Sequence, residues 1–108
     1  MHTGRPESLL RCALRTTGDR FVVAGEIDEA NASALGERLY AQPVATLDLA
    51  NVTFFSAAGL RVLLTLGPIA CAEGVVVDVH CSPPVWRILE LCDCRDVPGL
   101  RFVRGAER

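Results

Sequence analysis

The spacing of hydrophobic residues changes several times along the 108-residue chain, and each change marks a predicted element. Short apolar runs at residues 10–15 and 21–24 flank a turn-forming Thr-Thr-Gly-Asp sequence at residues 16–19, which predicts a β-hairpin. Apolar residues at helical spacing then predict an amphipathic helix over residues 29–41. We expect Asp28, directly before this pattern, to be its N-cap.

The next segment predicts a strand followed by a long helix. Residues 46–50 alternate in the manner of a strand, and the apolar series after residue 56 returns at helical spacing. Pro68 lies inside this helical series. Proline has no N–H to donate and its ring crowds the preceding turn, so we expect a kink or a break between Leu64 and Pro68.

Three further elements follow. The valine run at residues 75–79 is typical of a strand that is covered on both faces. Ser82, followed by two prolines, predicts the cap and first turn of a third helix, and residues 100–103 predict a closing strand. The predicted core face of the third helix consists of Val85, Ile88, Leu89 and Cys92.

Together these elements predict one α/β domain. Strands separated by single helices imply right-handed crossovers and a mostly parallel sheet, to which the opening hairpin adds antiparallel pairs. We therefore expect a mixed sheet of four or five strands with about three main helices, spanning residues 9–104. Residues 1–8 and 105–108 are predicted to be flexible termini.

The strongest functional signal is the sequence LDLANVTFFSAAGL at residues 47–60. It predicts a buried strand, a loop of small residues and a helix start, where free N–H groups and the positive end of the helix dipole can accept an anion. This segment resembles the signature of the STAS family, the anti-sigma-factor antagonists, which reads roughly L-D-L-S-x-V-x-F-[IM]-D-S-[SAT]-G-L. Three further segments resemble STAS motifs in the family order: GEID at residues 25–28, AEG at 72–74 and SPPVWRILEL at 82–91.

The resemblance implies a single STAS-like domain that acts as a protein–protein switch and not as an enzyme. An antagonist of this family binds an anti-sigma factor, often a serine kinase, and the kinase phosphorylates the serine that follows the signature aspartate. In this chain Ser56 stands at the aspartate position and Ala57 at the serine position. The resemblance therefore implies an anti-sigma factor or serine-kinase-like partner and a regulator that is not phosphorylated at the usual residue.

Two interpretations of Ser56 remain open: it caps the second helix by accepting an N–H from Ala58 or Gly59, or it is a displaced phosphoacceptor. Capping is the favoured one. Trp86 is either covered by a terminal segment or contacts a partner. The expected partner-binding residues are Gly25, Glu26, Asp28, Phe55, Ser56, Ala57, Ala58, Gly59, Leu60 and Trp86.

Composition narrows the remaining function classes. A net charge of −2, a pI near 5.6 and scattered arginines disfavour a nucleic-acid partner. There is neither an apolar run of roughly 20 residues nor an N-terminal export signal, so we expect a cytoplasmic protein without membrane insertion. No catalytic motif is visible and lysine is absent from the sequence, which disfavours an enzyme.

The five cysteines, with an odd count and no export signal, are expected to be free and mostly buried. The one grouping in the sequence that suggests a metal site consists of Cys92 and Cys94 together with Cys81 and His80. Its C-x-C spacing, however, is typical neither of zinc sites nor of redox sites. We therefore expect no metal and no cofactor. A competing function is a structural STAS subunit of a transport or stress-signalling assembly, which the missing acceptor serine favours. The oligomeric state is left open.

Overall fold

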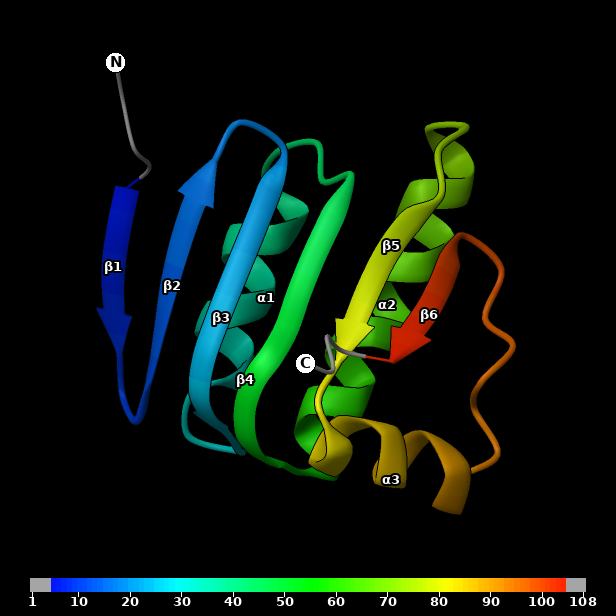
Figure 1. Ribbon diagram of the computed structural model, residues 1–108. Coiled ribbons are helices and arrows are strands. Elements are labelled where there is room, and N and C mark those ends of the chain that lie inside the picture. Colours follow the sequence, from blue (N-terminus) through cyan, green and yellow to red (C-terminus); the bar gives the residue numbers. More distant parts are fainter. Residues whose placement is uncertain (1–4, 105–108) are drawn as a thin grey trace.

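A computed structural model describes residues 5–104, which form one six-stranded sheet and three helices (Figure 1). The predicted α/β class is thereby confirmed. The strands are β1 (Arg5–Leu9), β2 (Cys12–Thr17), β3 (Arg20–Ile27), β4 (Thr46–Phe55), β5 (Val77–Cys81) and β6 (Leu100–Arg104). The helices are α1 (Ala32–Tyr40), α2 (Ala57–Ala72) and α3 (Pro83–Leu91).

The six strands lie in the sheet in their sequence order. The first three pair in antiparallel fashion, which confirms the predicted hairpin, and β3 to β6 pair in parallel with one connection between each pair. Helices α1, α2 and α3 lie in the connections from β3 to β4, from β4 to β5 and from β5 to β6, although the last connection also contains a loop at residues 92–99. A mixed, mostly parallel sheet is what the alternation of patterns predicts.

The predicted number of four or five strands is wrong, and the additional strand is β1. Residues 5–8, which we assigned to a flexible N-terminus, pair with β2 in a register that runs from Arg5 opposite Thr16 to Leu9 opposite Cys12. The strand escapes sequence analysis because it is a polar edge strand: the side chain facing α1 is Glu7, whose carboxylate binds the Arg38 guanidinium. Residues 1–4 and 105–108, also predicted to be flexible, lie outside the described part of the chain.

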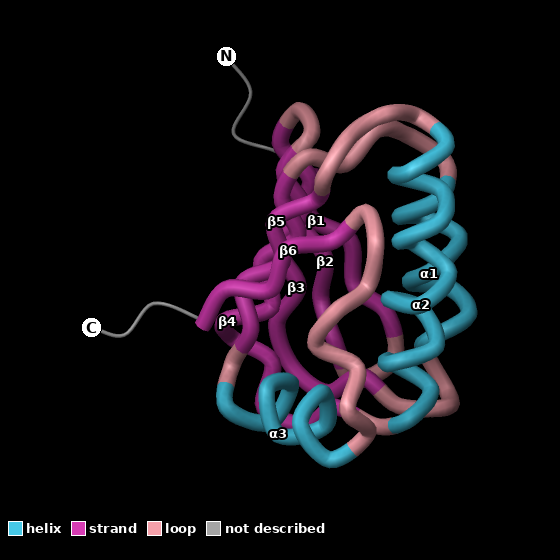
Figure 2. The backbone as a smooth tube through the Cα atoms, turned by 90° about the vertical axis from the view of Figure 1, so that its right-hand side faces the viewer, coloured by secondary structure: helices cyan, strands magenta, loops and turns pink. Residues whose placement is uncertain are grey.

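The helices are distributed unevenly about the sheet. Helices α1 and α2 pack side by side on one face, and α3 lies at the end of the sheet where β4 and β5 finish (Figure 2). The core lies between the sheet and the α1–α2 layer and extends to the buried side of α3. Its largest fully buried side chains are Phe21, Ile27, Leu35, Leu39, Leu47, Leu49, Leu63 and Leu89.

The valine run does not behave as predicted. Strand β5 begins only at Val77, and Val75 and Val76 are exposed residues of the connection that precedes it. Val77 and Val79 are buried, whereas Asp78 between them is half-exposed. Strand β5 is therefore covered by helices on one face and not on both, because α1 and α2 pack on the same side.

The ends of the helices differ from the sequence prediction in three places. Helix α1 begins after Asn31 and not after Asp28. Helix α2 continues through Pro68 to Ala72 without the break that we considered. At the start of α3, Ser82 is the N-cap residue by position, but its hydroxyl is buried and has no hydrogen-bond partner within residues 5–104.

Candidate functional site

Strands β3 and β4 bring the two main sequence motifs together. They run in parallel with Ile27 opposite Phe55, so both strands end at the same edge of the sheet (Figure 1). The N–H of Ser56 donates to the carbonyl of Ile27 over 3.1 Å. Residues 25–28 therefore lie beside residues 54–57, and we call the surface formed by these two segments the signature edge.

Ser56 is the N-cap of α2, as predicted. Its backbone is extended (φ −102°, ψ 179°), and its hydroxyl accepts the N–H of Ala58 over 3.1 Å. Ala57 is the first residue of the helix and is exposed. The positive end of the α2 dipole thus lies at the surface under a methyl group, which cannot be phosphorylated.

Four of the predicted contact residues around the signature loop are buried and pack beneath it. Phe55, Ala58 and Leu60 are buried. Gly59 is also enclosed, because a Cβ atom there would lie 2.6 Å from the Phe55 ring. We predicted these four residues as partner contacts, but their burial leaves Phe54, Ser56 and Ala57 as the part of residues 54–60 that reaches the surface.

On β3, residue 25 must be glycine for two reasons: its backbone conformation, and the close approach of the Arg11 carbonyl. Its φ is +108°, and a Cβ atom there would lie 2.6 Å from the carbonyl oxygen of Arg11. That same carbonyl accepts the N–H of Glu26 over 2.9 Å. The turn between β1 and β2 therefore lies directly against the predicted site, a proximity that the motif alone does not reveal.

Asp28 does not cap α1 and instead anchors this turn. One carboxylate oxygen accepts from Nε of Arg11 over 2.7 Å, and the other accepts the N–H of Ala30 over 2.9 Å. The hydrogen bond from Arg11 holds the pKa of Asp28 below its usual range. Glu26 is half-exposed and lies 4.0 Å from the same guanidinium. Arg11 thus faces two carboxylates, of which Asp28 is the closer partner and Glu26 the more weakly paired and more exposed one.

Asn31 is a site residue that sequence analysis missed. It is 1% exposed, and its side-chain nitrogen donates to the carbonyls of Leu10 (2.5 Å) and Glu26 (2.7 Å). Its side-chain oxygen accepts the N–H of Asp28 over 3.0 Å. Residue 31 lay inside the predicted helix at 29–41, and one of its partners, Leu10, is 21 residues away in the chain, so no local pattern indicated this role.

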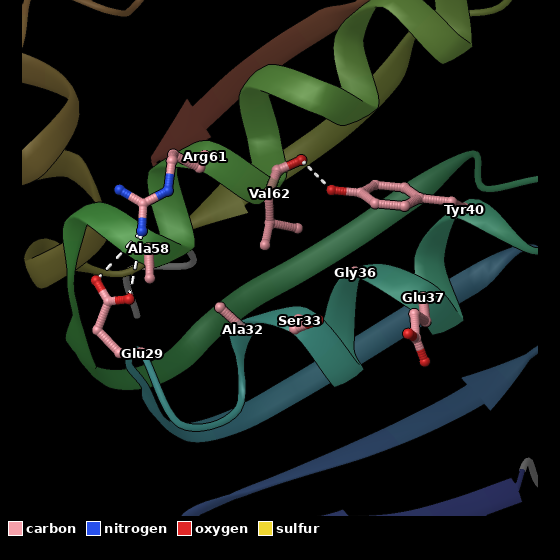
Figure 3. Close-up of a pocket in the computed structure, with 9 residues that line it drawn as sticks. All are labelled: Glu29, Ala32, Ser33, Gly36, Glu37, Tyr40, Ala58, Arg61 and Val62. Carbon is pink, nitrogen blue, oxygen red and sulfur yellow. Dashed lines mark hydrogen bonds and ion pairs between the residues drawn. The ribbon is translucent and has the colours of Figure 1, made fainter.

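A cavity of about 310 Å³ lies between α1 and α2, close to the start of α2 (Figure 3). Small residues of α1, including Ala32 and Gly36, form its floor. At one end the guanidinium of Arg61 pairs with Glu29 over 3.2 Å. At the other end the Tyr40 hydroxyl donates to the carbonyl of Val62 over 3.1 Å. The Tyr40 contact joins α1 to α2, and the exposed Arg61–Glu29 pair joins α2 to the connection before α1.

The side-chain contacts of Trp86 involve neither residues 25–28 nor residues 54–57. Its indole N–H donates to Glu90 over 3.0 Å, and the guanidinium of Arg104 stacks over its ring at 4.9 Å from the centroid. Glu90 belongs to α3, and Arg104 belongs to β6. The side chain is half-buried, so of the two interpretations above, the structure favours cover by the C-terminal strand.

The cysteines follow the predicted pattern only in part. Cys12 and Cys81 are buried, and burial raises the pKa of the Cys81 thiol to about 12. Cys71 and Cys92 are exposed, so the placement of Cys92 on the core face of α3 was wrong: it follows the last turn of the helix. Within residues 5–104, no three His, Cys, Asp or Glu side chains are grouped so that they could hold a metal ion.

Two comparisons by sequence give no match: no family model and no curated protein matches this chain. A comparison with solved structures finds an anti-sigma factor antagonist from Mycobacterium paratuberculosis, with a TM-score of 0.51 and 25% sequence identity. The match covers 82% of this chain and 81% of that one. It confirms the resemblance to the STAS family that the ordered motifs indicated. In the described part of the chain, no helix has the length and apolar character needed to span a membrane.

Proposed function

We propose that the chain is a non-enzymatic regulator of the anti-sigma-factor antagonist type, which binds an anti-sigma factor or serine-kinase-like protein through the signature edge. The observation that carries the proposal is the start of α2. There, in a fold similar to that of an antagonist, an exposed Ala57 replaces the serine of the family signature beside residues 25–28.

Ala57 keeps this surface in one chemical form. A phosphate would add about −1.5 to −2 charges, which the start of a helix tolerates but which an apolar or acidic partner surface disfavours. Without a hydroxyl at residue 57, the chain cannot be released from its partner by phosphorylation there. Binding is then controlled by the amount of the protein or by the state of its partner.

Ser56 is a poor substitute for the missing acceptor. Its hydroxyl oxygen is engaged with the N–H of Ala58 and its side chain is only half-exposed. A kinase would have to break this cap, which contributes about 1 kcal/mol to the helix.

The proposal is tested by affinity purification of the tagged protein from its native host, with Ala57→Glu as the matched variant. Glutamate in the first turn favours the helix, so the variant is expected to fold, while its charge imitates a phosphate. We expect mass spectrometry to identify an anti-sigma factor or kinase-like protein with the unaltered chain and much less of it with Ala57→Glu.

Other outcomes of the purification contradict the proposal. Recovery of transporter subunits or a large stress-signalling assembly would favour the structural-subunit function, for which the missing acceptor serine also speaks. Equal recovery of the anti-sigma factor with both proteins would show that it does not bind over Ala57.

A further inference from the structure

Two large apolar side chains are exposed on the same edge of the sheet. Leu10, in the turn between β1 and β2, is 59% exposed, and Phe54, near the end of β4, is 50% exposed. An exposed leucine alone needs no explanation, but neighbouring apolar side chains with a polar surround are typical of contact surfaces. The polar residue between them is Glu26.

Backbone geometry holds these three residues together. Glu26 and Phe54 are register partners on parallel strands, so their side chains leave the same face of the sheet. The carbonyls of Leu10 and Glu26 both accept from the single side-chain nitrogen of Asn31. The backbone of the turn therefore lies beside the end of β3, and Phe54 lies next to Glu26; we call Leu10, Glu26 and Phe54 at this edge the Leu10–Phe54 patch.

The patch is rigid before any partner arrives. Asn31 is buried, and its three hydrogen bonds fix the turn, the end of β3 and residue 28. The ion pair between Arg11 and Asp28 adds a second attachment for the turn. A preorganised surface loses less conformational entropy on binding, so more of its contact energy appears as affinity.

The charge of the patch indicates what it can bind. Arg11 pairs with Asp28 over 2.7 Å and with Glu26 over 4.0 Å, so one guanidinium faces two carboxylates and the edge keeps a net negative charge, with the half-exposed Glu26 as its more weakly paired acid. A second copy of the chain is a poor occupant, because a two-fold contact centred here would bring two Glu26 carboxylates together. A basic group on a different protein is complementary.

We propose that the Leu10–Phe54 patch is part of the partner interface and receives an apolar segment of the anti-sigma-type protein that carries an arginine or lysine opposite Glu26. This inference rests on the proposed function and extends its surface from the start of α2 to the turn between β1 and β2. Phe54 is the expected anchor, since buried aromatic residues dominate the affinity of most interfaces. Glu26 contributes orientation and association rate.

The test is calorimetric titration of the full chain with the recombinant anti-sigma factor identified in the purification described above. Phe54→Ser is expected to weaken binding by about tenfold or more and Leu10→Ser by about fivefold. Glu26→Gln is expected to weaken it by about threefold and to reduce its dependence on salt. The matched control is Val76→Ser: Val76 is also 59% exposed but lies before β5, at the opposite end of the sheet (Figure 1), and its loss should change affinity by less than about twofold.

The outcomes separate this inference from the proposed function. If the anti-sigma factor binds the unaltered chain and all four variants equally well, the patch is not part of the interface, although the function stands. If it does not bind the unaltered chain, both proposals fail. Light scattering adds one further outcome: a dimer of the free chain that Phe54→Ser dissociates would assign the patch to a second copy and overturn the inference.

Discussion

At the scale of single residues, the signature edge depends on side chains that hold backbone groups in place. Ser56 binds the N–H of Ala58, and Asp28 binds the side chain of Arg11 together with the N–H of Ala30. Asn31 does more than either, because it satisfies two carbonyls and one N–H and so joins the turn at Leu10 to residues 25–28. The shape of the site is therefore set by a residue that is not itself on the surface.

Replacing Asn31 with aspartate tests this role. The asparagine and aspartate side chains are nearly equal in size, but a carboxylate at that position would face the carbonyls of Leu10 and Glu26 without a proton to donate. We expect a loss of about 2–4 kcal/mol in the free energy of unfolding at pH 7, measured by urea denaturation. Asn51→Asp, at an exposed position of β4, is the control and should change stability by less than about 0.5 kcal/mol.

The pH dependence of Asn31→Asp has a defined sign. Burial and the two carbonyls raise the pKa of the new carboxyl in the folded state above its unfolded value. The penalty is therefore present at neutral pH and becomes smaller as the pH falls through the folded pKa, because the protonated form can donate one hydrogen bond. A difference from the unaltered chain that does not change between pH 7 and pH 5 would contradict this account of Asn31.

At the scale of secondary-structure elements, helix α2 begins at the signature edge and contains a proline in its interior. It continues to Ala72, so the residues around Pro68 remain helical although Pro68 cannot donate to the carbonyl of Leu64. Proline inside a helix costs about 3 kcal/mol relative to alanine. Its restriction of the unfolded chain offsets about 1 kcal/mol of that cost.

Pro68→Ala is therefore expected to stabilise the domain by about 1–2 kcal/mol. Pro68 is exposed, so no core packing is lost. Thermal and urea melts measure the change, and Pro43→Ala, at an exposed proline outside the helices, should be neutral or slightly destabilising by comparison. A clear loss of stability in Pro68→Ala would mean that the helix needs the proline where it stands.

At this scale, some elements of the fold follow from the sequence and others do not. Helical and strand spacing identify α1, α2, α3 and the central strands, because those elements bury a regular apolar face against one another. Strand β1 is not identifiable in this way, since its inward side chain is a glutamate that depends on Arg38 of a distant helix. Val75 and Val76 mislead for the opposite reason: they are apolar but belong to an exposed connection.

The candidate site was predictable in position and less so in detail. We expected residues 25–28 and the signature loop to belong to one partner surface, and the two segments lie side by side because β3 and β4 are neighbours. Sequence could not tell which of the two adjacent phenylalanines is exposed, because register irregularities between β3 and β4 decide the facing of Phe54 and Phe55. The contribution of Leu10 depends on tertiary contacts of Asn31, which have no local pattern.

At the scale of the whole molecule, ion pairs between segments that are distant in sequence join the elements. Arg11 pairs with Asp28, and Arg101 of β6 pairs with Asp78 of β5 over 2.7 Å. In both pairs the hydrogen bond from the arginine lowers the pKa of the aspartate. Lowered folded-state values mean that these carboxylates favour the folded state above their unfolded pKa.

Stability should therefore be nearly constant from about pH 5 to 8 and should decrease as the pH falls below about 4, where these carboxylates become protonated. Urea denaturation across this range measures it. In the double variant Asp28→Asn, Asp78→Asn we expect a lower stability at pH 7 and a shallower decrease in acid. An equally steep acid decrease in that variant would assign the effect to other carboxyl groups.

The measurement that tests the central claim most directly is intact-mass spectrometry of the chain after incubation with Mg-ATP and an antagonist-directed serine kinase. We predict no added phosphate, because Ala57 has no hydroxyl and the hydroxyl of Ser56 is engaged in capping α2. The double variant Ser56→Asp, Ala57→Ser restores the family pair at the helix start and should gain one phosphate and bind the partner more weakly. A phosphate on the unaltered chain, mapped to Ser56, would contradict the account and make Ser56 the regulatory residue.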